Sequence, residues 1–228
     1  MTGYYNEKVL NKFADALNDA KTAVRAGDIR VRFSNSNSKM GAVASVSTLP
    51  FLTCPDTCKW TCGVKCYAAK LANLRPSVLK SYAVNTAIAI YRPIEYWNQI
   101  NEFCKGVRYF RFHVSGDILN AAYFHHMIDV ANDNPKCEFL CFTKRYDVVN
   151  KWIDENGELP CNLHILFSGW TNLTPDNPYN LPETNVFTCD ADFNDDWKVC
   201  GGNCFNCACR GVGCWQACKG DTIAFKMH

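Results

Sequence analysis

The sequence has no long hydrophobic run and no large excess of either charge. No apolar stretch approaches the roughly 18 residues that a membrane-spanning helix needs. The 24 Lys and Arg residues nearly balance the 22 Asp and Glu residues, and the formal charge of +2 argues against a strongly basic nucleic-acid-binding protein. Residues 1–21 carry charges throughout and therefore do not resemble a secretory signal. The sequence thus indicates neither a membrane nor a nucleic acid as a partner, and it predicts a cytoplasmic location.

Low-complexity segments and strong internal repeats are also missing, so the sequence indicates neither a linker nor a solenoid. With 228 residues, of which 48% are apolar, 13% aromatic and 20% charged, the chain can bury a sizeable core. We expect a single domain over residues 1–228. Its parts are an N-terminal helix and hairpin in 1–50, a cysteine loop with β/α units in 51–190, and a cysteine-rich extension in 191–228.

Hydrophobic periodicity predicts an α/β fold. The expected helices are 6–26, a long segment 76–104 that Pro93 divides in two, 119–132 and 146–156; the expected strands are 29–33, 42–49, 107–114, 138–143, 163–168 and 185–189. From residue 107 onward strands and helices largely alternate, as they do in β-α-β units. The sequence therefore predicts a mainly parallel sheet in a partial (β/α) barrel-like arrangement with a cysteine-rich C-terminal extension.

Cysteine is far more frequent than in ordinary proteins, with 15 residues in the chain. The number is odd, so the cysteines cannot all pair internally, and a chain without an export signal is expected in a reducing compartment. The first cluster holds Cys54, Cys58, Cys62 and Cys66; the second holds Cys200, Cys204, Cys207, Cys209, Cys214 and Cys218; the scattered ones are Cys104, Cys137, Cys141, Cys161 and Cys189. Lone cysteines are among the most buried residue types, so we expect the scattered ones in the interior, with Cys189 as a partial exception.

Clusters of cysteine predict a site for a soft metal. Four thiolates satisfy either a tetrahedral zinc ion or a four-iron cubane. Zinc sites favour two close pairs, and only Cys204 and Cys207 have the two-residue gap of such a pair. We therefore favour iron–sulfur clusters, two or more and of the 4Fe–4S type, over zinc and over free or disulfide-bonded cysteines. The ten clustered cysteines are the expected metal ligands, and Cys189, at a strand end, is the first candidate for a further one.

Polar residues follow each strand of the expected parallel sheet. The strand ends read Ser115-Gly116-Asp117, Thr143-Lys144-Arg145, Ser168-Gly169-Trp170 and Thr188-Cys189-Asp190. Sites in parallel α/β folds lie beyond the carboxyl ends of the strands, so these loops are expected to share one pocket. For any single loop, exposure to solvent explains the polarity as well. In a shared pocket, Lys144 and Arg145 are expected to contact a carboxylate or phosphate.

The strand 107–114 alternates between two faces. Arg111, His113 and Ser115 would lie on one face, where buried Arg and His are costly unless they are paired or hydrated, and this predicts a polar cavity. His113 is either a ligand or proton carrier, or a histidine that satisfies a backbone carbonyl. Trp170 is expected to form either a packing lid or a stacking platform.

Several motifs occur together between residues 33 and 218. They are SNSKMG at 36–41, STLP at 47–50, Cys54-Pro55 through Cys62 to Cys66-Tyr67-Ala68, FHVSGDI at 112–118, FTKR at 142–145, SGW at 168–170, and Cys204, Cys207 and Cys214-Trp215. Together they resemble the phage-encoded gene product 88 family of uncharacterised proteins. The resemblance implies a cysteine-rich, metal-binding protein in the cytoplasm of a phage host. The first segment of that family has three cysteines, and Cys58 is an additional one.

The chain resembles radical S-adenosylmethionine (SAM) enzymes more weakly. The resemblance lies in the order of its elements, which is a cysteine loop, then helices, then a strand that ends in residues 115–117. This resemblance implies that Cys54, Cys62 and Cys66 hold a reactive cluster and that Ser115, Gly116 and Asp117 orient SAM. A cubane held by three thiolates leaves one iron open, and a carboxylate can accept a hydrogen bond from an ammonium group. The triad of that family has gaps of three and two residues, whereas the gaps around Cys62 are three and three.

Three functions remain open on this basis. The first is a radical-SAM-like iron–sulfur enzyme with His113, Lys144 and Arg145 as catalytic candidates, an unknown small-molecule or macromolecular substrate, and an electron donor as partner. The second is a non-catalytic iron–sulfur protein for electron transfer, sensing or rigidity. The third is a zinc-stabilised module for nucleic acid or host protein, with Trp60 and Trp215 near its cysteines, against which the near-zero net charge argues.

Overall fold

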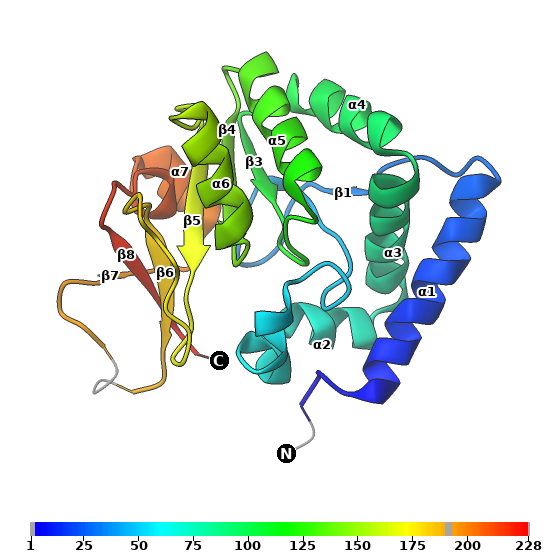
Figure 1. Cartoon of the computed structure of the whole chain (residues 1–228), viewed down its shortest axis with the longest axis horizontal. Helices are drawn as coiled ribbons and strands as arrows, with labels where there is room; N and C mark the ends of the chain where they lie inside the picture. Colours follow the sequence, from blue (N-terminus) through cyan, green and yellow to red (C-terminus); the bar gives the residue numbers. More distant parts are fainter. Residues whose placement is uncertain (1–2, 190–192, 228) are drawn as a thin grey trace.

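An open β-sheet of eight strands forms the centre of the computed structural model, which describes residues 3–189 and 193–227 (Figure 1). The strands are β1 (Phe33–Ser34), β2 (Ala44–Val46), β3 (Tyr109–Phe112), β4 (Glu138–Thr143), β5 (Leu163–Ser168), β6 (Glu183–Phe187), β7 (Lys198–Val199) and β8 (Thr222–Lys226). They lie in the order β1-β2-β3-β4-β5-β6-β8-β7, and all neighbours are parallel except β1 and β2. The predicted α/β class with a mainly parallel sheet is confirmed, and the sheet does not close into a barrel.

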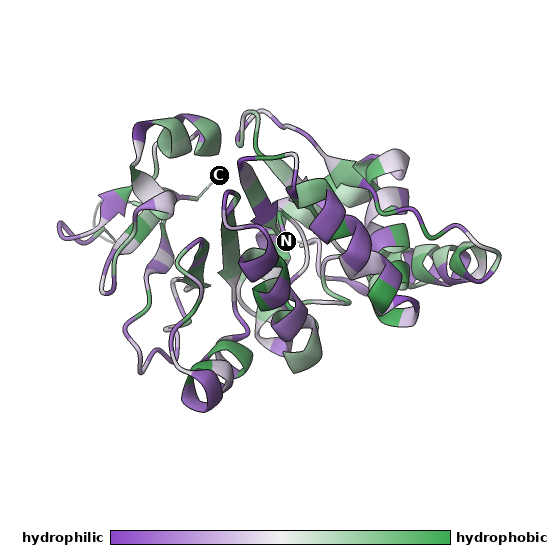
Figure 2. Cartoon of the chain, turned by 90° about the horizontal axis from the view of Figure 1, so that it is seen from above, coloured by the Kyte–Doolittle hydropathy of each residue, from purple (hydrophilic) through white to green (hydrophobic). Residues whose placement is uncertain are grey.

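Helices surround the sheet, and purple and green residues alternate along them in the hydropathy view (Figure 2). The α-helices are α1 (Glu7–Arg25), α2 (Tyr67–Leu74), α3 (Pro76–Tyr91), α4 (Pro93–Cys104), α5 (Ala121–Asp133), α6 (Tyr146–Asn156) and α7 (Cys204–Arg210); the 3-10 helices are η1 (Asp56–Lys59), η2 (Cys62–Lys65) and η4 (Gly213–Trp215). Local chemistry sets several ends. The side chain of Asn6 accepts a hydrogen bond from the Val9 amide at the start of α1, and Pro93 begins α4 where the sequence predicts a break.

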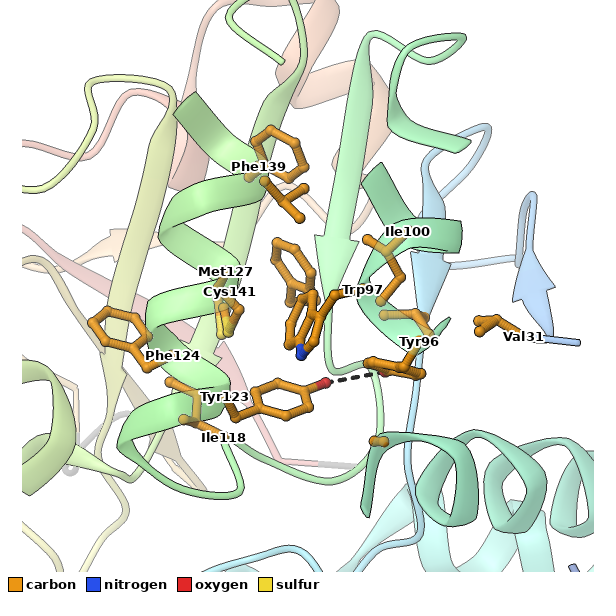
Figure 3. Packing of buried hydrophobic residues seen from close by; sticks show 14 of the residues in the cluster. Val31, Tyr96, Trp97, Ile100, Ile118, Tyr123, Phe124, Met127, Phe139 and Cys141 are labelled. Carbon is orange, nitrogen blue, oxygen red and sulfur yellow. Dashed lines mark hydrogen bonds between the residues drawn. The ribbon is translucent and has the colours of Figure 1, made fainter. Parts of the chain in front are cut away.

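A large aromatic core fills the helix-covered face of the sheet. Phe110 and Phe112 of β3 and Phe139 of β4 point to this face, where residues of α1, α3, α4, α5 and α6 pack against them. Figure 3 shows part of this cluster, including the hydroxyl groups of Tyr96 and Tyr123, which lie 3.0 Å apart and share a hydrogen bond. This face carries the larger of the two hydrophobic cores.

A much smaller core covers the opposite face. Leu140, Leu166 and Ile223 alternate with the inward residues of the first face and pack against Met40 and Trp215. Both α7 and η4 belong to the C-terminal extension, so this extension provides the cover for the second face. A parallel sheet is normally covered on both faces, and the cysteine-rich segment performs this function here.

Some expectations differ from the structure. The strands of the N-terminal hairpin are shorter than predicted, and α2, α7, β7 and β8 are not predicted at all. The missed elements are short, and cysteine, glycine and asparagine in the C-terminal segment carry no clear periodicity. The expected boundary at 190/191 and the strand-end residue Asp190 lie outside the described residues. Within the described ranges, no helix combines the length and the hydropathy required to cross a membrane.

Candidate functional site

The cysteine loop after β2 is attached to the end of β3 by a reciprocal pair of hydrogen bonds. The amide of Thr48 donates to the carbonyl of Ser115 at 3.0 Å, and the hydroxyl of Ser115 donates to the carbonyl of Thr48 at 2.9 Å. Both residues are buried. The hydroxyl of Thr86 on α3 accepts a further bond from the amide of Leu49 at 2.8 Å. The start of the cysteine loop is therefore fixed between the sheet and α3.

Gly116 permits the two loops to approach closely. Its φ is +82°, and a Cβ atom added there would lie 2.0 Å from Oγ1 of Thr48 and 2.5 Å from Oγ1 of Thr53. The hydroxyl groups of Thr48 and Thr53 are themselves hydrogen-bonded at 3.1 Å. Only glycine combines this backbone conformation with the missing side chain, so the SGD sequence is explained by loop packing.

Asp117 joins the ends of β3 and β4. Its carboxylate accepts hydrogen bonds from the Ile118 amide at 2.7 Å, the Thr143 hydroxyl at 2.6 Å and the Lys144 amide at 2.9 Å. Burial raises the pKa of Asp117, and these hydrogen bonds act in the opposite direction. Since its oxygens already accept three internal bonds, the orientation of SAM by residues 115–117 stays a prediction without a supporting contact.

Lys144 brings the FTKR and SGW motifs to the cysteine loop. Its ammonium donates to the Ser168 hydroxyl at 2.7 Å and lies 5.9 Å from the ring centroid of Trp170. The same positive charge partly offsets the raised pKa values of Cys58, Cys62 and Cys66. Three of the predicted strand-end loops therefore meet at one place, at the arrowhead end of the central strands (Figure 1).

The first cysteine group consists of Cys54, Cys58, Cys62 and Cys66. The 3-10 helices η1 and η2 fold the intervening residues into tight turns, and hydrogen bonds link the thiol of Cys58 with those of Cys54 and Cys62. Cys66 is the N-cap of α2, where its sulfur accepts a hydrogen bond from the Ala69 amide at 3.4 Å. Cys58, the cysteine additional to the family pattern, is 5% exposed and lies in the middle of this group.

Three thiols of the first group, those of Cys58, Cys62 and Cys66, have raised pKa values. The hydrogen bond with Cys54 is the largest cause of the raised pKa of Cys58, and the bond with Cys58 is the largest cause for Cys62. Burial raises the pKa of Cys66 to about 11. Several thiolates can therefore be present together only if a cation compensates their charge.

The second cysteine group consists of Cys200, Cys204, Cys207 and Cys214. Electrostatic interactions connect Cys214 with the other three, and burial raises its pKa to about 12. Burial also raises the pKa of Cys207, and Cβ atoms added to Gly201 or Gly213 would lie 3.3 or 3.4 Å from its sulfur. The four residues come from the loop before α7, from α7 itself and from η4.

The SNSKMG loop supports the second group. The amides of Cys204 and Phe205 donate to the carbonyls of Lys39 and Met40 at 3.2 and 2.9 Å. The indole of Trp215 donates to the carbonyl of Cys204 at 3.0 Å. The two sequence motifs that precede the cysteine loop thus support different groups. The STLP motif anchors the loop of the first group, and the SNSKMG motif is hydrogen-bonded to the second group.

Arg111 lies beside the second group as Lys144 lies beside the first. One of its terminal nitrogens is 3.9 Å from the sulfur of Cys204, and its guanidinium stacks on the Phe142 ring at 4.3 Å. Its charge partly offsets the effect of burial, which raises the pKa of Cys214. Both groups therefore have a positive neighbour on the sheet.

Tyr67 lies between the two groups. Its hydroxyl donates to the carbonyl of Val114, and it interacts electrostatically with Cys62 and Cys66 on one side and with Cys204 on the other. The sequence does not single out this residue, although it follows Cys66 directly. Val114 packs in the same small core as Cys204 and Cys214, so Tyr67 and Val114 link the two groups, which are separated by more than 130 residues in the chain.

The remaining candidate ligands lie outside both groups. Cys189, Cys209 and Cys218 are exposed. On α7, Cys204 and Cys207 are three residues apart and share a face, whereas Cys209 lies on another face, so helical periodicity could have separated them. Among the scattered cysteines, Cys104, Cys137 and Cys141 are buried as expected, whereas the expectation for the exposed Cys161 is wrong.

His113 and Arg145 are placed differently from the other strand-end residues. A positive φ of +59° turns His113 towards the helix-covered face, where its ring lies 5.4 Å from that of Tyr123, so the prediction that it shares a face with Arg111 is wrong. Neither ring nitrogen has a hydrogen-bond partner among the described residues, and burial lowers the pKa of His113 to about 3. All three guanidinium nitrogens of Arg145 bind the carboxylate of Asp147 or loop carbonyls, so its contact with a substrate stays a prediction.

No three His, Cys, Asp or Glu side chains in the described ranges are grouped so that they could hold one metal ion. All fifteen cysteines are free thiols. The two groups are therefore gatherings of thiols that lack the close convergence of a single-ion site. A four-iron cubane is wider than a single ion, so its ligands stand further apart.

The chain belongs to the Gene product 88 family, whose model matches residues 10–211. Comparisons with curated proteins and with solved structures give no match. The match spans the first cysteine group, Cys200, Cys204 and Cys207 of the second group, and the motifs described above as far as Cys207, and it ends before Cys214. It therefore confirms the stronger of the two resemblances, while nothing in the comparisons supports the weaker one to radical SAM enzymes.

Proposed function

We propose that the protein binds two iron–sulfur clusters of the 4Fe–4S type, one at each cysteine group, and uses them for electron transfer. The observation that carries the proposal is the gathering of four thiols at each of two neighbouring places, beside Lys144 in one case and Arg111 in the other. A bound cluster would supply one-electron chemistry. The residues of the chain would bind it, exclude water from it and place a positive charge beside it.

The protonation of the thiols supports a cationic occupant. Placing buried thiols with raised pKa values near one another does not by itself stabilise the fold, because their ionised forms repel one another. Metal binding replaces these protons and is coupled to folding. The free state of all fifteen cysteines also supports our proposal that the protein works in a reducing cytoplasm, that of the phage host.

The spacing of the thiols favours a cluster over zinc. A structural zinc ion needs four ligands about 2.3 Å from one centre when all are sulfur. The described residues offer no such group of three. The wider cage of a cubane places its ligands further apart, which agrees better with cysteines of which no three are grouped around one point among the described residues.

Metal content and colour test the proposal. Protein purified without oxygen is expected to contain about eight irons and eight sulfides per chain and to show a broad band at about 400 nm. The variants Cys62→Ser and Cys207→Ser should each lose about four irons, whereas the matched variant Cys209→Ser should retain all of them. A colourless protein with zinc, or an iron content insensitive to Cys62 and Cys207, would contradict the proposal.

The radical-SAM-like enzyme remains a separate prediction. Incubation of fully loaded protein with SAM and dithionite would yield 5′-deoxyadenosine if that activity existed. Since the carboxylate of Asp117 is occupied by internal donors, we expect no such product. The electron-transfer function does not depend on this outcome.

A further inference from the structure

Helix α2 directs its small apolar side chains towards the core and leaves its large apolar side chains exposed. The residues that face the interior are Ala68, Ala69 and Ala72, which are at most 4% exposed. The large side chains of Leu71 and Leu74 point outward and are 41% and 64% exposed. Tyr67 is 62% exposed, although its hydroxyl reaches inward to the Val114 carbonyl. A surface helix normally places its large apolar residues inward, so the outer face of α2 is not explained by the fold of this chain.

The exposed apolar surface continues from α2 onto the preceding turns. Val64 in η2 is 44% exposed and Trp60 is 61% exposed. Together these five residues form what we call the docking stripe: Trp60, Val64, Tyr67, Leu71 and Leu74. Positions 67, 71 and 74 have the spacing of one helix face, which is the pattern by which a helix contacts a partner. Contiguous exposed apolar side chains of this kind mark interaction sites.

The docking stripe lies in a segment of the chain that carries positive charge and no carboxylate. Residues 57–94 contain no Asp or Glu, and they contain six basic residues, all exposed: Lys59, Lys65, Lys70, Arg75, Lys80 and Arg92. Lys70 lies on the same face of α2 as the stripe, and neither it nor Arg75 forms an ion pair with any other described residue. The chain as a whole carries only +2, so the rest of it is net acidic. The partner that this surface fits is negatively charged.

The docking stripe begins at a candidate cluster ligand. Cys66 is the N-cap of α2, and Tyr67 is the next residue. A helix of 8 residues is about 12 Å long, so a protein that covers α2 comes within that distance of the first cysteine group. Short separations of this kind are needed when an electron passes between proteins.

We propose that the docking stripe binds a small acidic one-electron carrier protein of the ferredoxin type, an inference that rests on the proposed iron–sulfur function. One electron leaves the reduced carrier, which becomes oxidised, and enters the cluster held by the first cysteine group; no proton or bond is transferred. Complexes of this type are small and transient, as a short stripe requires. The aliphatic side chains of Val64, Leu71 and Leu74 favour a protein over a nucleic acid, since they cannot stack on bases.

Binding and reduction are measured separately. The probe is an acidic plant-type [2Fe–2S] ferredoxin, titrated in its oxidised form into the intact anaerobic protein and, in its reduced form, mixed with it in stopped flow. We expect the affinity to fall steeply as ionic strength rises. The variants Leu71→Ser with Leu74→Ser, and Lys70→Glu with Arg75→Glu, should lower both the affinity and the second-order reduction rate at least about tenfold.

Controls separate this proposal from the proposed function. All four altered side chains are exposed, so the iron content and the rate of reduction by dithionite should stay unchanged. Ile94→Ser with Lys8→Glu changes an apolar residue that is 68% exposed and an exposed lysine, both outside the docking stripe, and it should have no effect. If the stripe variants keep their clusters and bind ferredoxin as well as the unaltered protein does, the proposal is overturned. It is also overturned if the stripe mediates only self-association or only binding of a single-stranded oligonucleotide. Loss of the clusters themselves overturns the proposed function instead.

Discussion

The two cysteine groups are supported in different ways. The first group lies in a loop that is fixed by hydrogen bonds to the strand ends and by the close contact of Gly116 with Thr48, above the thick aromatic core. The second group lies on a short helix that rests on the small core around Trp215. We infer that the first site is largely formed by the fold itself, whereas the second depends more on its occupant, because metal binding is coupled to folding.

The largest effect is expected where the first group is attached to the sheet. Gly116→Ala places a Cβ atom 2.0 Å from Oγ1 of Thr48 and strains a backbone with φ of +82°, so the free energy of unfolding should fall by about 3 kcal/mol or more. Urea denaturation measures the change. Gly157→Ala is the matched control, since it has a similar φ of +89° but no atom within 4 Å, and it should cost about 1 kcal/mol. Equal losses in both variants would mean that close packing at Gly116 is unimportant.

The buried His113 should make the stability of the protein sensitive to acid. Burial lowers the pKa of His113 from 6.5 to about 3, so the folded state resists protonation that the unfolded state accepts. The stability contributed by the neutral ring is complete above pH 6.5 and is lost as the pH falls towards 3. Between about pH 8 and about pH 5 the loss should be about 2 kcal/mol, and His113→Asn should abolish it.

An exposed histidine provides the comparison. His125→Asn should leave the pH dependence of stability unchanged, because His125 is exposed on α5. Unfolding curves at both pH values distinguish the variants. If His113→Asn kept the full acid sensitivity, another group would be responsible for it.

The support of the second group should be weaker and more local. Trp215→Phe removes the hydrogen bond to the Cys204 carbonyl and part of a buried ring, at a cost of about 1.5 kcal/mol in unfolding free energy. Its main effect should be a loss of iron from the second group with the first intact. Trp60→Phe changes a tryptophan that is 61% exposed and should alter neither quantity. Equal iron loss from both groups would show that they are not independently supported.

The smallest expected effect concerns the positive neighbours. In protein without metal, Lys144→Gln removes a charge that lowers the pKa of Cys66, so alkylation of Cys66 by iodoacetamide at neutral pH should slow by a few-fold. Alkylation of Cys214 should not change, because its neighbour is Arg111. Arg111→Gln should give the reverse pattern. Peptide mass spectrometry reads both sites in one experiment, and a uniform change would show that the charges do not act locally.

Strands with strong patterns could be predicted, and short irregular elements could not. The boundaries of β4, β5 and α6 agree with the sequence because their apolar runs are bounded by clear breaks such as Gly157. Helix α2 could not be predicted from periodicity, since its interior face consists of alanine and its large residues face outward. The short strand β7 and helix α7 lie in a segment where cysteine spacing obscures any hydrophobic period.

The candidate site was predictable in outline. The cysteine clusters and the loops at Asp117, Lys144 and Ser168 are visible in the sequence, and the structure brings these loops together. The roles of these residues could not be predicted from the sequence, because the contacts that each polar side chain makes in the folded chain determine its role. Asp117 and Arg145 bind their own chain, and the positive φ of His113 reverses the direction that strand alternation gives it.

The residue pattern alone determined the α/β class, the parallel sheet, the family and the presence of two concentrations of thiols, because periodicity and spacing are properties of neighbours along the chain. Only the tertiary structure decided that β8 lies between β6 and β7, that Tyr67 stands between both groups, and that Cys209 is separated from Cys207. These contacts depend on segments far apart in sequence, whose relative positions are set by how both faces of the sheet are covered.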